Sequence, residues 1–358
     1  MQSENTWRIA LDSNQEIRDV QTQYSSVSQA TKGSSILPTV FGQEGDLFYK
    51  FLDESMFAVV TANKNDPSTL TIYLVNGVTG RIVHQFKEAN VSPAAQHKVC
   101  AVFSEQFFAL TFMRKNASTG LFQQELTVIE LYRKQKEADT KQLLTDYFKG
   151  ADRITSETYS AFGEEGDPIV LRASYFLPFG VSAVSLTETA NHITGRTMVF
   201  VTSDNKLFQL AQSGFTARRL HPDEVKAPAG WFTMPDPAEL ELEPVEPPME
   251  LQLKSDKFPV YDPMIPQYDV RFLTYDLPIV GLSSMRTFTT KLESTSQVFA
   301  YGHDLFLARI RPDNKYDMID EDFNYSLLFL AILGLFSVDY LLAKYLKAEK
   351  GKKDFLVH

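Results

Sequence analysis

The sequence has a single cysteine, Cys100, in 358 residues, so an internal disulfide cannot form. This excludes the small disulfide-stapled modules typical of secreted proteins. Cys100 lies in the apolar run HKVCAVF, which predicts a buried, unreactive thiol. Catalytic motifs are also lacking: HExxH, CxxC, GxSxG and a phosphate-binding glycine loop do not occur, and the six histidines have no metal-ligand spacing. The sequence predicts neither an enzyme nor a metal or cofactor site.

Positive charge is scarce, because 35 Lys and Arg face 45 Asp and Glu, for a net charge of -10. A nucleic-acid-binding protein needs a basic surface to neutralise phosphates, so no nucleic-acid partner is expected. The opening, MQSENTWRIALDSNQEIRDV, also lacks the basic and apolar regions of a signal peptide. Two explanations stay open: the chain is the C-terminal part of a longer protein, or it is a tail-anchored protein whose body is cytosolic.

One long apolar run does occur, near the C-terminus. Residues 325–343 carry one charge, and at about 1.5 Å rise per residue a helix of this length spans roughly 28 Å, close to the hydrocarbon thickness of a bilayer. They show no polar stripe of the kind found on a core helix of a soluble domain. A single transmembrane helix is therefore predicted. Lysines crowd the tail, residues 344–358, whereas acidic residues precede the span, so the tail is expected to be cytosolic and the body to lie in the endoplasmic reticulum lumen or outside the cell.

Most of the remaining sequence alternates between short apolar runs and turn-forming residues, which is typical of β-strands. Four such runs between residues 47 and 88 suit one antiparallel sheet the size of a propeller blade. The segments LVNGVTGRIVHQF, FVTSDNKLFQLA and FAYGHDLFLARI repeat the same strand, turn and strand. This repeat favours a propeller over a sandwich. The predicted fold is all-β, with β-propeller blades that form the C-terminal part of a propeller, followed by a single C-terminal transmembrane α-helix.

Changes in composition divide the chain into segments. These are an irregular N-terminal segment, 1–44, with a short strand at 7–11; blades at 45–220, with a helical segment inserted near 133–166; a Pro-rich acidic excursion, 221–267; closing strands within 268–318, at 279–282, 297–301 and 304–310; the membrane helix, 325–343; and the basic tail, 344–358. The inserted helix suits either a membrane surface or docking on the domain. The excursion holds ten of the seventeen prolines, and it is either a passive connector or an arm that wraps a partner subunit.

Three residues outside any catalytic pattern are candidate sites. Asn116 begins the sequon Asn-Ala-Ser in a predicted turn, which is a glycosylation acceptor if the body is lumenal. Asp339 lies inside the span, where an ionised carboxylate is costly. Either Asp339 and Lys344 face partner helices and set how the span packs against them, or the helix ends early and Asp339 lies at the cytosolic interface, neutralised by Lys344 or reached by water.

The run GLSSMRTFTTKLESTSQVFAYGHDLFLARIRPDNKYDMIDEDFNY, followed by one apolar span and a basic tail, resembles the C-terminal domain of the family of subunit 1 of the endoplasmic reticulum (ER) membrane protein complex. Upstream, LVNGVTGRIVHQF, ELTVIELY and SYFLPFGVSAVSLTETANHITGRTMVFVTSDNKLFQL are similar to that family in the same order. The resemblance covers most of residues 45–345.

The resemblance implies a function. It suggests a non-enzymatic lumenal scaffold of an insertase that places tail-anchored and multipass clients in the ER membrane. The implied topology is single-pass type I, with the body lumenal and the C-terminus cytosolic. The implied partners are the other subunits of the complex, membrane lipid and client membrane proteins. The alternative, which needs no resemblance, is a tail-anchored cytosolic β-propeller adaptor at a membrane.

The resemblance also assigns structural roles within the YGHDLFLAR match. Tyr301, Gly302, Asp304 and Arg309 are expected to define the fold rather than to bind partners. Gly302 suits a turn with positive φ, and Arg309 suits an ion pair with a carboxylate of the same blade. Members of the family are longer, open with a signal peptide and a first propeller, and build blades from both ends of the polypeptide.

Overall fold

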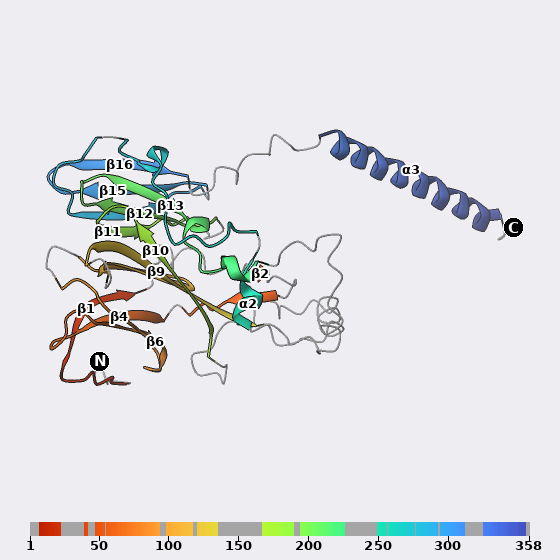
Figure 1. The fold of residues 1–358 in the computed structure, drawn as a ribbon. Coiled ribbons are helices and arrows are strands. Elements are labelled where there is room, and N and C mark those ends of the chain that lie inside the picture. The colour runs from red at the N-terminus through yellow and green to blue at the C-terminus, as the bar shows by residue number, and fades with distance from the viewer. Residues whose placement is uncertain are drawn as a thin grey trace, which may run out of the picture. The chain divides into compact units, whose positions relative to one another are not determined.

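The structure, a computed structural model, describes residues 7–22, 39–41, 47–134, 167–225, 249–311 and 325–355, with short gaps at 54, 94–97, 117–119, 190–193, 256, 276 and 293. The chain forms two compact units, Met1–Asp313 and Asn314–His358. The first is built from β-sheets and the second contains one long helix (Figure 1).

The described residues of the first unit form four antiparallel sheets. Blade 1 contains β1 (Gln15–Thr22), β4 (Met56–Asn63), β5 (Leu70–Asn76) and β6 (Ile82–Glu88). Blade 2 contains β7 (Cys100–Ser104), β8 (Phe107–Lys115), β9 (Phe122–Lys134) and β10 (Ile169–Leu177), and the end of β9 also pairs with β3 (Leu47–Lys50) and, through it, β2 (Thr39–Phe41). Blade 3 contains β11 (Val181–Leu186), β12 (Thr197–Thr202) and β13 (Leu207–Ala211). Blade 4 contains β14 (Ser284–Thr289), β15 (Ser296–Tyr301) and β16 (Leu305–Ile310).

The four sheets are arranged as propeller blades. Blades 3 and 4 are meanders, as are β4–β6 of blade 1 and β7–β10 of blade 2, whereas β1 pairs with β4 across the intervening β2 and β3. The first strands of the blades meet at one side: β7 contacts both β1 and β11, and β11 contacts β14. The sheets therefore stack in chain order, as Figure 1 shows. This arrangement confirms the predicted all-β fold of propeller blades.

Packing between the blades explains why so many strand residues are apolar. Side chains alternate between the two faces of a strand. On β8, Phe108 and Leu110 enter the core shared with blade 1, whereas Phe107 and Ala109 enter the core shared with blade 3. A third core joins blades 3 and 4, with Val298 completely buried. Blades 2 and 3 are thus covered on both faces, which demands nearly continuous apolar runs.

Residues 255–282 form a strap across the outer strands of blades 2 and 3. The amide of Ile265 donates to the carbonyl of Phe176 in β10 at 3.0 Å, and the amide of Leu273 donates to the carbonyl of Leu207 in β13 at 2.8 Å. The strap follows the short helix α2 (Met249–Leu253) and includes the 3-10 turn η5 (Asp269–Arg271). Two more 3-10 turns, η2 (Gln212–Gly214) and η3 (Pro222–Glu224), lead out of blade 3. The described part of the predicted excursion therefore lies on the chain's own blades.

Four expectations need correction or fall outside the described residues. The segment 1–44 is not irregular throughout, because β1 pairs with β4, and residues 7–11 form no strand. Ile17 and Val20 of β1 are exposed, so backbone pairing rather than an apolar pattern defines this strand. Residues 279–282 form a loop rather than the predicted strand, and Gly281 has a φ of 63°. The apolar side chains of Ile279 and Leu282 pack in the core between blades 3 and 4. The inserted helix predicted near 133–166 lies outside the described residues, except that residues 133 and 134 form the end of β9.

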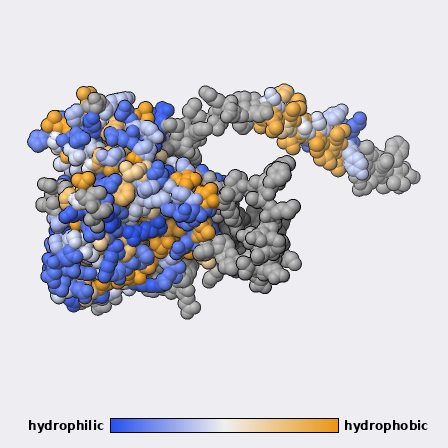
Figure 2. Space-filling view, in the orientation of Figure 1, coloured by the Kyte–Doolittle hydropathy of each residue, from blue (hydrophilic) through white to orange (hydrophobic). Residues whose placement is uncertain are grey.

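The second unit contains α3 (Tyr325–Phe355). Its stretch Ser326–Lys347, 22 residues long, is long and apolar enough to cross a membrane. The side chains of this stretch are exposed, and Figure 2 shows hydrophobic residues along it with hydrophilic ones toward its C-terminal end. The predicted apolar C-terminal helix is therefore present, and it continues beyond the predicted end at residue 343.

Candidate interaction sites

The described residues contain no cluster of three or more His, Cys, Asp or Glu side chains arranged to hold a metal ion. Cys100 is half-buried, and its Sγ donates to the carbonyl oxygen of Ser182 at 3.5 Å. Burial raises the pKa of the Cys100 thiol to about 11, which keeps it protonated at neutral pH. Two other features of the described residues are candidates for function: a buried ionic network between two blades and the exposed surface of blade 4.

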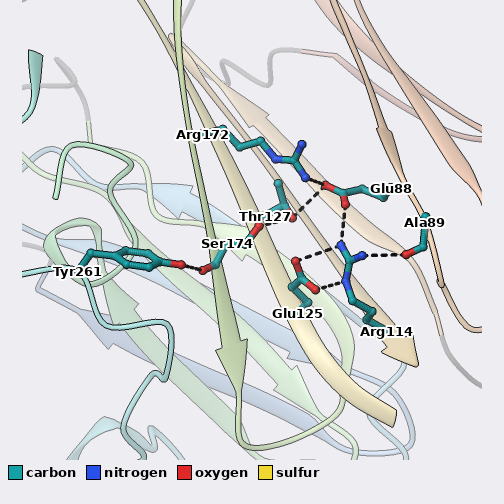
Figure 3. A network of polar contacts seen from close by, with 8 residues as sticks. All are labelled: Glu88, Ala89, Arg114, Glu125, Thr127, Arg172, Ser174 and Tyr261. Atoms are coloured by element: carbon teal, nitrogen blue, oxygen red, sulfur yellow. Dashed lines mark hydrogen bonds and ion pairs between the residues drawn. The ribbon is translucent and has the colours of Figure 1, made fainter. Parts of the chain in front are cut away.

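A buried ionic network, the blade 1–2 clasp, joins the first two blades (Figure 3). The carboxylate of Glu88, at the end of β6, is 2% exposed and accepts from Arg114 of β8 at 2.6 Å and from Arg172 of β10. Arg114 also donates to Glu125 of β9 and to the carbonyl of Ala89 at 2.8 Å. Burial lowers the pKa of Arg114, but the hydrogen bonds and charges of Glu125 and Glu88 outweigh this and raise it. The clasp therefore holds its charges paired.

Sequence reasoning missed the clasp, although it left a signal. Glu88 occupies a buried position of β6, two residues after the buried Phe86, and Glu125 lies just before the buried apolar residues of β9. A buried carboxylate requires a paired cation. A carboxylate at a strand position that alternation predicts to be buried therefore indicates an ion pair. The sequence does not reveal which cations on other strands are its partners.

Blade 4 presents an open sheet surface, the blade 4 outer face. Its side chains alternate with those that enter the core shared with blade 3. The outer face comprises Arg286, Phe288, Gln297, Phe299, Tyr301, Leu305, Leu307 and Arg309. Leu305 is 72% exposed and Leu307 64% exposed, and no blade among the described residues covers them. The face combines apolar side chains with two arginines and no carboxylate.

The residues of the YGHD turn hold the end of the strap against blade 4. The carboxylate of Asp304 accepts from the amide of Val280 at 3.1 Å, and the amide of Asp304 donates to the carbonyl of Val280 at 3.2 Å. A Cβ on Gly302 would lie 1.9 Å from the carbonyl oxygen of Gly281. The expectation of a positive φ at Gly302 is wrong, because the positive φ occurs at Gly281 instead. Glycine is needed at position 302 because the two backbones approach closely there.

The other two motif residues lie on the blade 4 outer face. A hydrogen bond from Ser284 lowers the pKa of Tyr301, with a smaller contribution from Arg286. Arg309 is opposite Gln297 in the β15–β16 register. The expected ion pair between Arg309 and a carboxylate of the same blade does not occur in the described part of the chain.

The remaining candidates are a turn and two helix positions. Asn116 is exposed where β8 leads into the turn to β9, and its amide donates to the carbonyl of Leu121 at 2.8 Å. Asp339 and Lys344 are both exposed on α3. The helix continues to Phe355, so it does not end early near Asp339.

Comparison with known proteins identifies the fold. A family model described as "ER membrane protein complex subunit 1, second beta-propeller" matches residues 1–313. The chain belongs to this family. Proteins named ER membrane protein complex subunit 1 are similar to it: that of Gallus gallus is 26% identical over 93% of this chain and 29% of its own length, and that of Schizosaccharomyces pombe is 26% identical over 82% and 28%. The Saccharomyces cerevisiae protein is 23% identical over 98% of this chain and 41% of its length.

Membership of the subunit 1 family confirms the resemblance inferred from the sequence. The chain spans about 29% of the length of the vertebrate relatives it matches. The family model ends before α3, but the alignment with the S. cerevisiae protein covers 98% of the chain and so includes most of this helix. The names of the relatives, together with an apolar helix able to cross a bilayer, fit a location at the ER membrane.

Proposed function

We propose that this chain acts as a lumenal scaffold of the ER membrane protein complex and supports the insertion of tail-anchored and multipass client proteins. The observation that carries the proposal is the family match over residues 1–313, because the matched relatives are named as subunits of that complex. The first unit suits a scaffold, since its described residues include stacked sheets and a buried clasp, and they contain no cluster arranged to hold a metal ion.

The blade 4 outer face is the surface that we assign to assembly. Leu305 and Leu307 are largely exposed in the isolated chain, and covering an apolar side chain of this size contributes about 1.5–3 kcal/mol. Arg286 and Arg309 flank the apolar residues, which suits a partner surface bearing carboxylates. We therefore propose that other parts of the complex cover this face.

The proposed topology is single-pass type I in the ER membrane. The lysines after the span support a cytosolic C-terminus. The exposed position of Asn116 at a turn suits modification by a lumenal glycosyltransferase. Under this topology, the blades and their outer faces are available to lumenal partners.

The test of the proposed function replaces Leu305 and Leu307 by Asp in the gene at its own locus. Two carboxylates on this face oppose its burial, so co-purification with the other subunits should fall about tenfold, which corresponds to 1.4 kcal/mol. Insertion of a tail-anchored reporter should fall with it. Leu121→Asp is the matched control, because Leu121 is 70% exposed but lies in the β8–β9 turn. Equal co-purification of the double variant and the control would contradict the assignment of this face.

A further inference from the structure

Between Ser326 and Tyr340, the membrane-spanning part of α3 contains two polar side chains, Ser337 and Asp339, and they differ in their hydrogen bonding. The hydroxyl of Ser337 donates to the carbonyl oxygen of Leu333 at 2.8 Å, so it is satisfied within its own helix. Asp339 has no hydrogen-bond partner in the described part of the chain. A carboxylate only accepts hydrogen bonds, and the backbone amides along the helix are already used by the helix itself.

The neighbours of Asp339 on the helix surface offer no donor. Side chains meet on a helix at spacings of three and four residues, which here are Leu335, Phe336, Leu342 and Ala343. Lys344 is five residues away, and at 100° per residue this places it roughly 140° around the helix. Lys344 therefore marks a different face and does not neutralise Asp339 within α3.

Asp339 also lies too far from either membrane surface for water or lipid headgroups to hydrogen-bond its carboxylate. The apolar stretch runs from Ser326 to Lys347, so its midpoint falls between Phe336 and Ser337. At about 1.5 Å per residue, this stretch, centred in a hydrocarbon core about 30 Å thick, places Asp339 roughly 4 Å from the midplane and about 11 Å from the nearer edge. The side chain of Asp is too short to reach headgroups from this depth, and ionisable residues at such depths are normally paired.

We propose that Asp339 forms a hydrogen-bonded ion pair with a Lys or Arg side chain on a transmembrane helix of a neighbouring subunit. Charge complementarity decides the partner, because a cation lets the carboxylate stay ionised whereas a neutral donor does not. The apolar residues Leu328, Ile332 and Leu335 share the Asp339 face and pack around the pair. The pair fixes the rotation of α3 in the assembly. This inference rests on the proposed function, since it requires membrane-embedded neighbours.

The test uses the full-length gene at its own locus, tagged after His358, with Asp339→Leu, Asp339→Asn and the control Ser337→Ala. Membrane-embedded and lumenal subunits that co-purify in mild detergent are quantified separately. We expect both Asp339 variants to lose membrane-embedded subunits at least tenfold, because Leu and Asn each leave the partner's cation unpaired. Ser337→Ala should match the wild type, since it removes only a bond internal to α3.

Two results would overturn the inference. Asp339→Leu with wild-type recovery of membrane-embedded subunits would show that no partner depends on the carboxylate. Asp339→Asn with wild-type recovery would show that the partner is a neutral donor and not a cation. Failure of the proposed function looks different, because then the wild-type chain itself would not recover the complex.

A photoreactive residue tests the geometry independently of stability. Placed at Leu342, 60° from Asp339 around the helix, it should crosslink to one membrane-embedded subunit, and placed at Leu341, on another face, it should not crosslink to that subunit. Replacing the basic residue nearest to the crosslink by Leu should restore recovery in the Asp339→Leu background, because both charges are then gone. Equal crosslinking from the two positions would contradict a fixed rotation of α3.

Discussion

Arg114→Met is the substitution that tests most directly how the blades are held together. Arg114 is the hub of the blade 1–2 clasp, where it contacts two carboxylates that are nearly inaccessible to water. Methionine keeps most of the aliphatic packing, including that against Phe112, whose ring centre is 5.1 Å from the guanidinium carbon. The substitution therefore removes the charge and its donors with little change in volume.

The magnitude follows from what remains after the change. Glu125, with a side chain that is 5% exposed, loses its ion pair, whereas Glu88 keeps Arg172. Breaking a buried pair by removing one partner costs about 3–5 kcal/mol. Because Arg114 is 25% exposed and Arg172 remains, we expect the lower end, about 3 kcal/mol. The first unit, Met1–Asp313, has an unfolding entropy of about 0.65 kcal/mol/K, so each kcal/mol lowers Tm by about 1.5 °C and Tm should fall by about 4–5 °C.

The assay is thermal unfolding of the full chain in detergent, followed by circular dichroism. Arg81→Met is the matched control, because the Arg81–Asp167 pair has side chains that are 51% and 73% exposed and should contribute under about 1 kcal/mol. Adding Glu125→Leu to Arg114→Met should recover part of the loss, since the stranded carboxylate is gone. Equal Tm shifts for Arg114→Met and Arg81→Met would refute the reasoning.

Three further predictions concern single groups. Burial and, less strongly, the charge of Arg172 lower the pKa of His84. Below about pH 6.5 the unfolded chain therefore binds more protons than the folded chain, so Tm should fall as the pH drops below about 6.5. The His84→Gln variant should show a smaller difference in Tm between about pH 7.5 and 5.5. Because its thiol pKa is about 11, Cys100 should react with iodoacetamide at pH 7.5 on the order of a hundredfold more slowly than a free thiol, and a rate equal to that of glutathione would contradict this. Gly302→Ala places a Cβ against the Gly281 carbonyl and should cost about 1–3 kcal/mol in unfolding measurements, whereas Gly195→Ala, with its nearest contact at 3.9 Å, should cost less.

The parts of the fold that the sequence predicted are those governed by local pattern. The strands β4, β5, β12 and β13 have apolar runs bounded by turn residues, and they were predictable because both their burial and their turns are encoded nearby. β1 was not, because Ile17 and Val20 are exposed and the strand depends on pairing with β4, far along the chain. The strap was missed for a similar reason, since its backbone hydrogen bonds come from strands distant in sequence.

The candidate sites divide in the same way. Asp339 could be selected from sequence because a carboxylate in an apolar run is conspicuous, but its separation from Lys344 around the helix required the continuous α3. The outer position of Leu305 and Leu307 required the register between β15 and β16 and the packing of blade 4 on blade 3. The role of Gly302 depended on the approach of the Gly281 loop, which no local pattern reveals.

The central claim is that the blades work in the ER lumen, and protease protection on sealed microsomes tests it most directly. The gene is tagged after His358 at its own locus, and a glycosidase shift is read with Asn116→Gln as the control. The account predicts a protected body, a tag removed by external protease, and a glycan that disappears in the Asn116→Gln variant. A digested body with a protected tag would contradict it and favour the tail-anchored cytosolic adaptor.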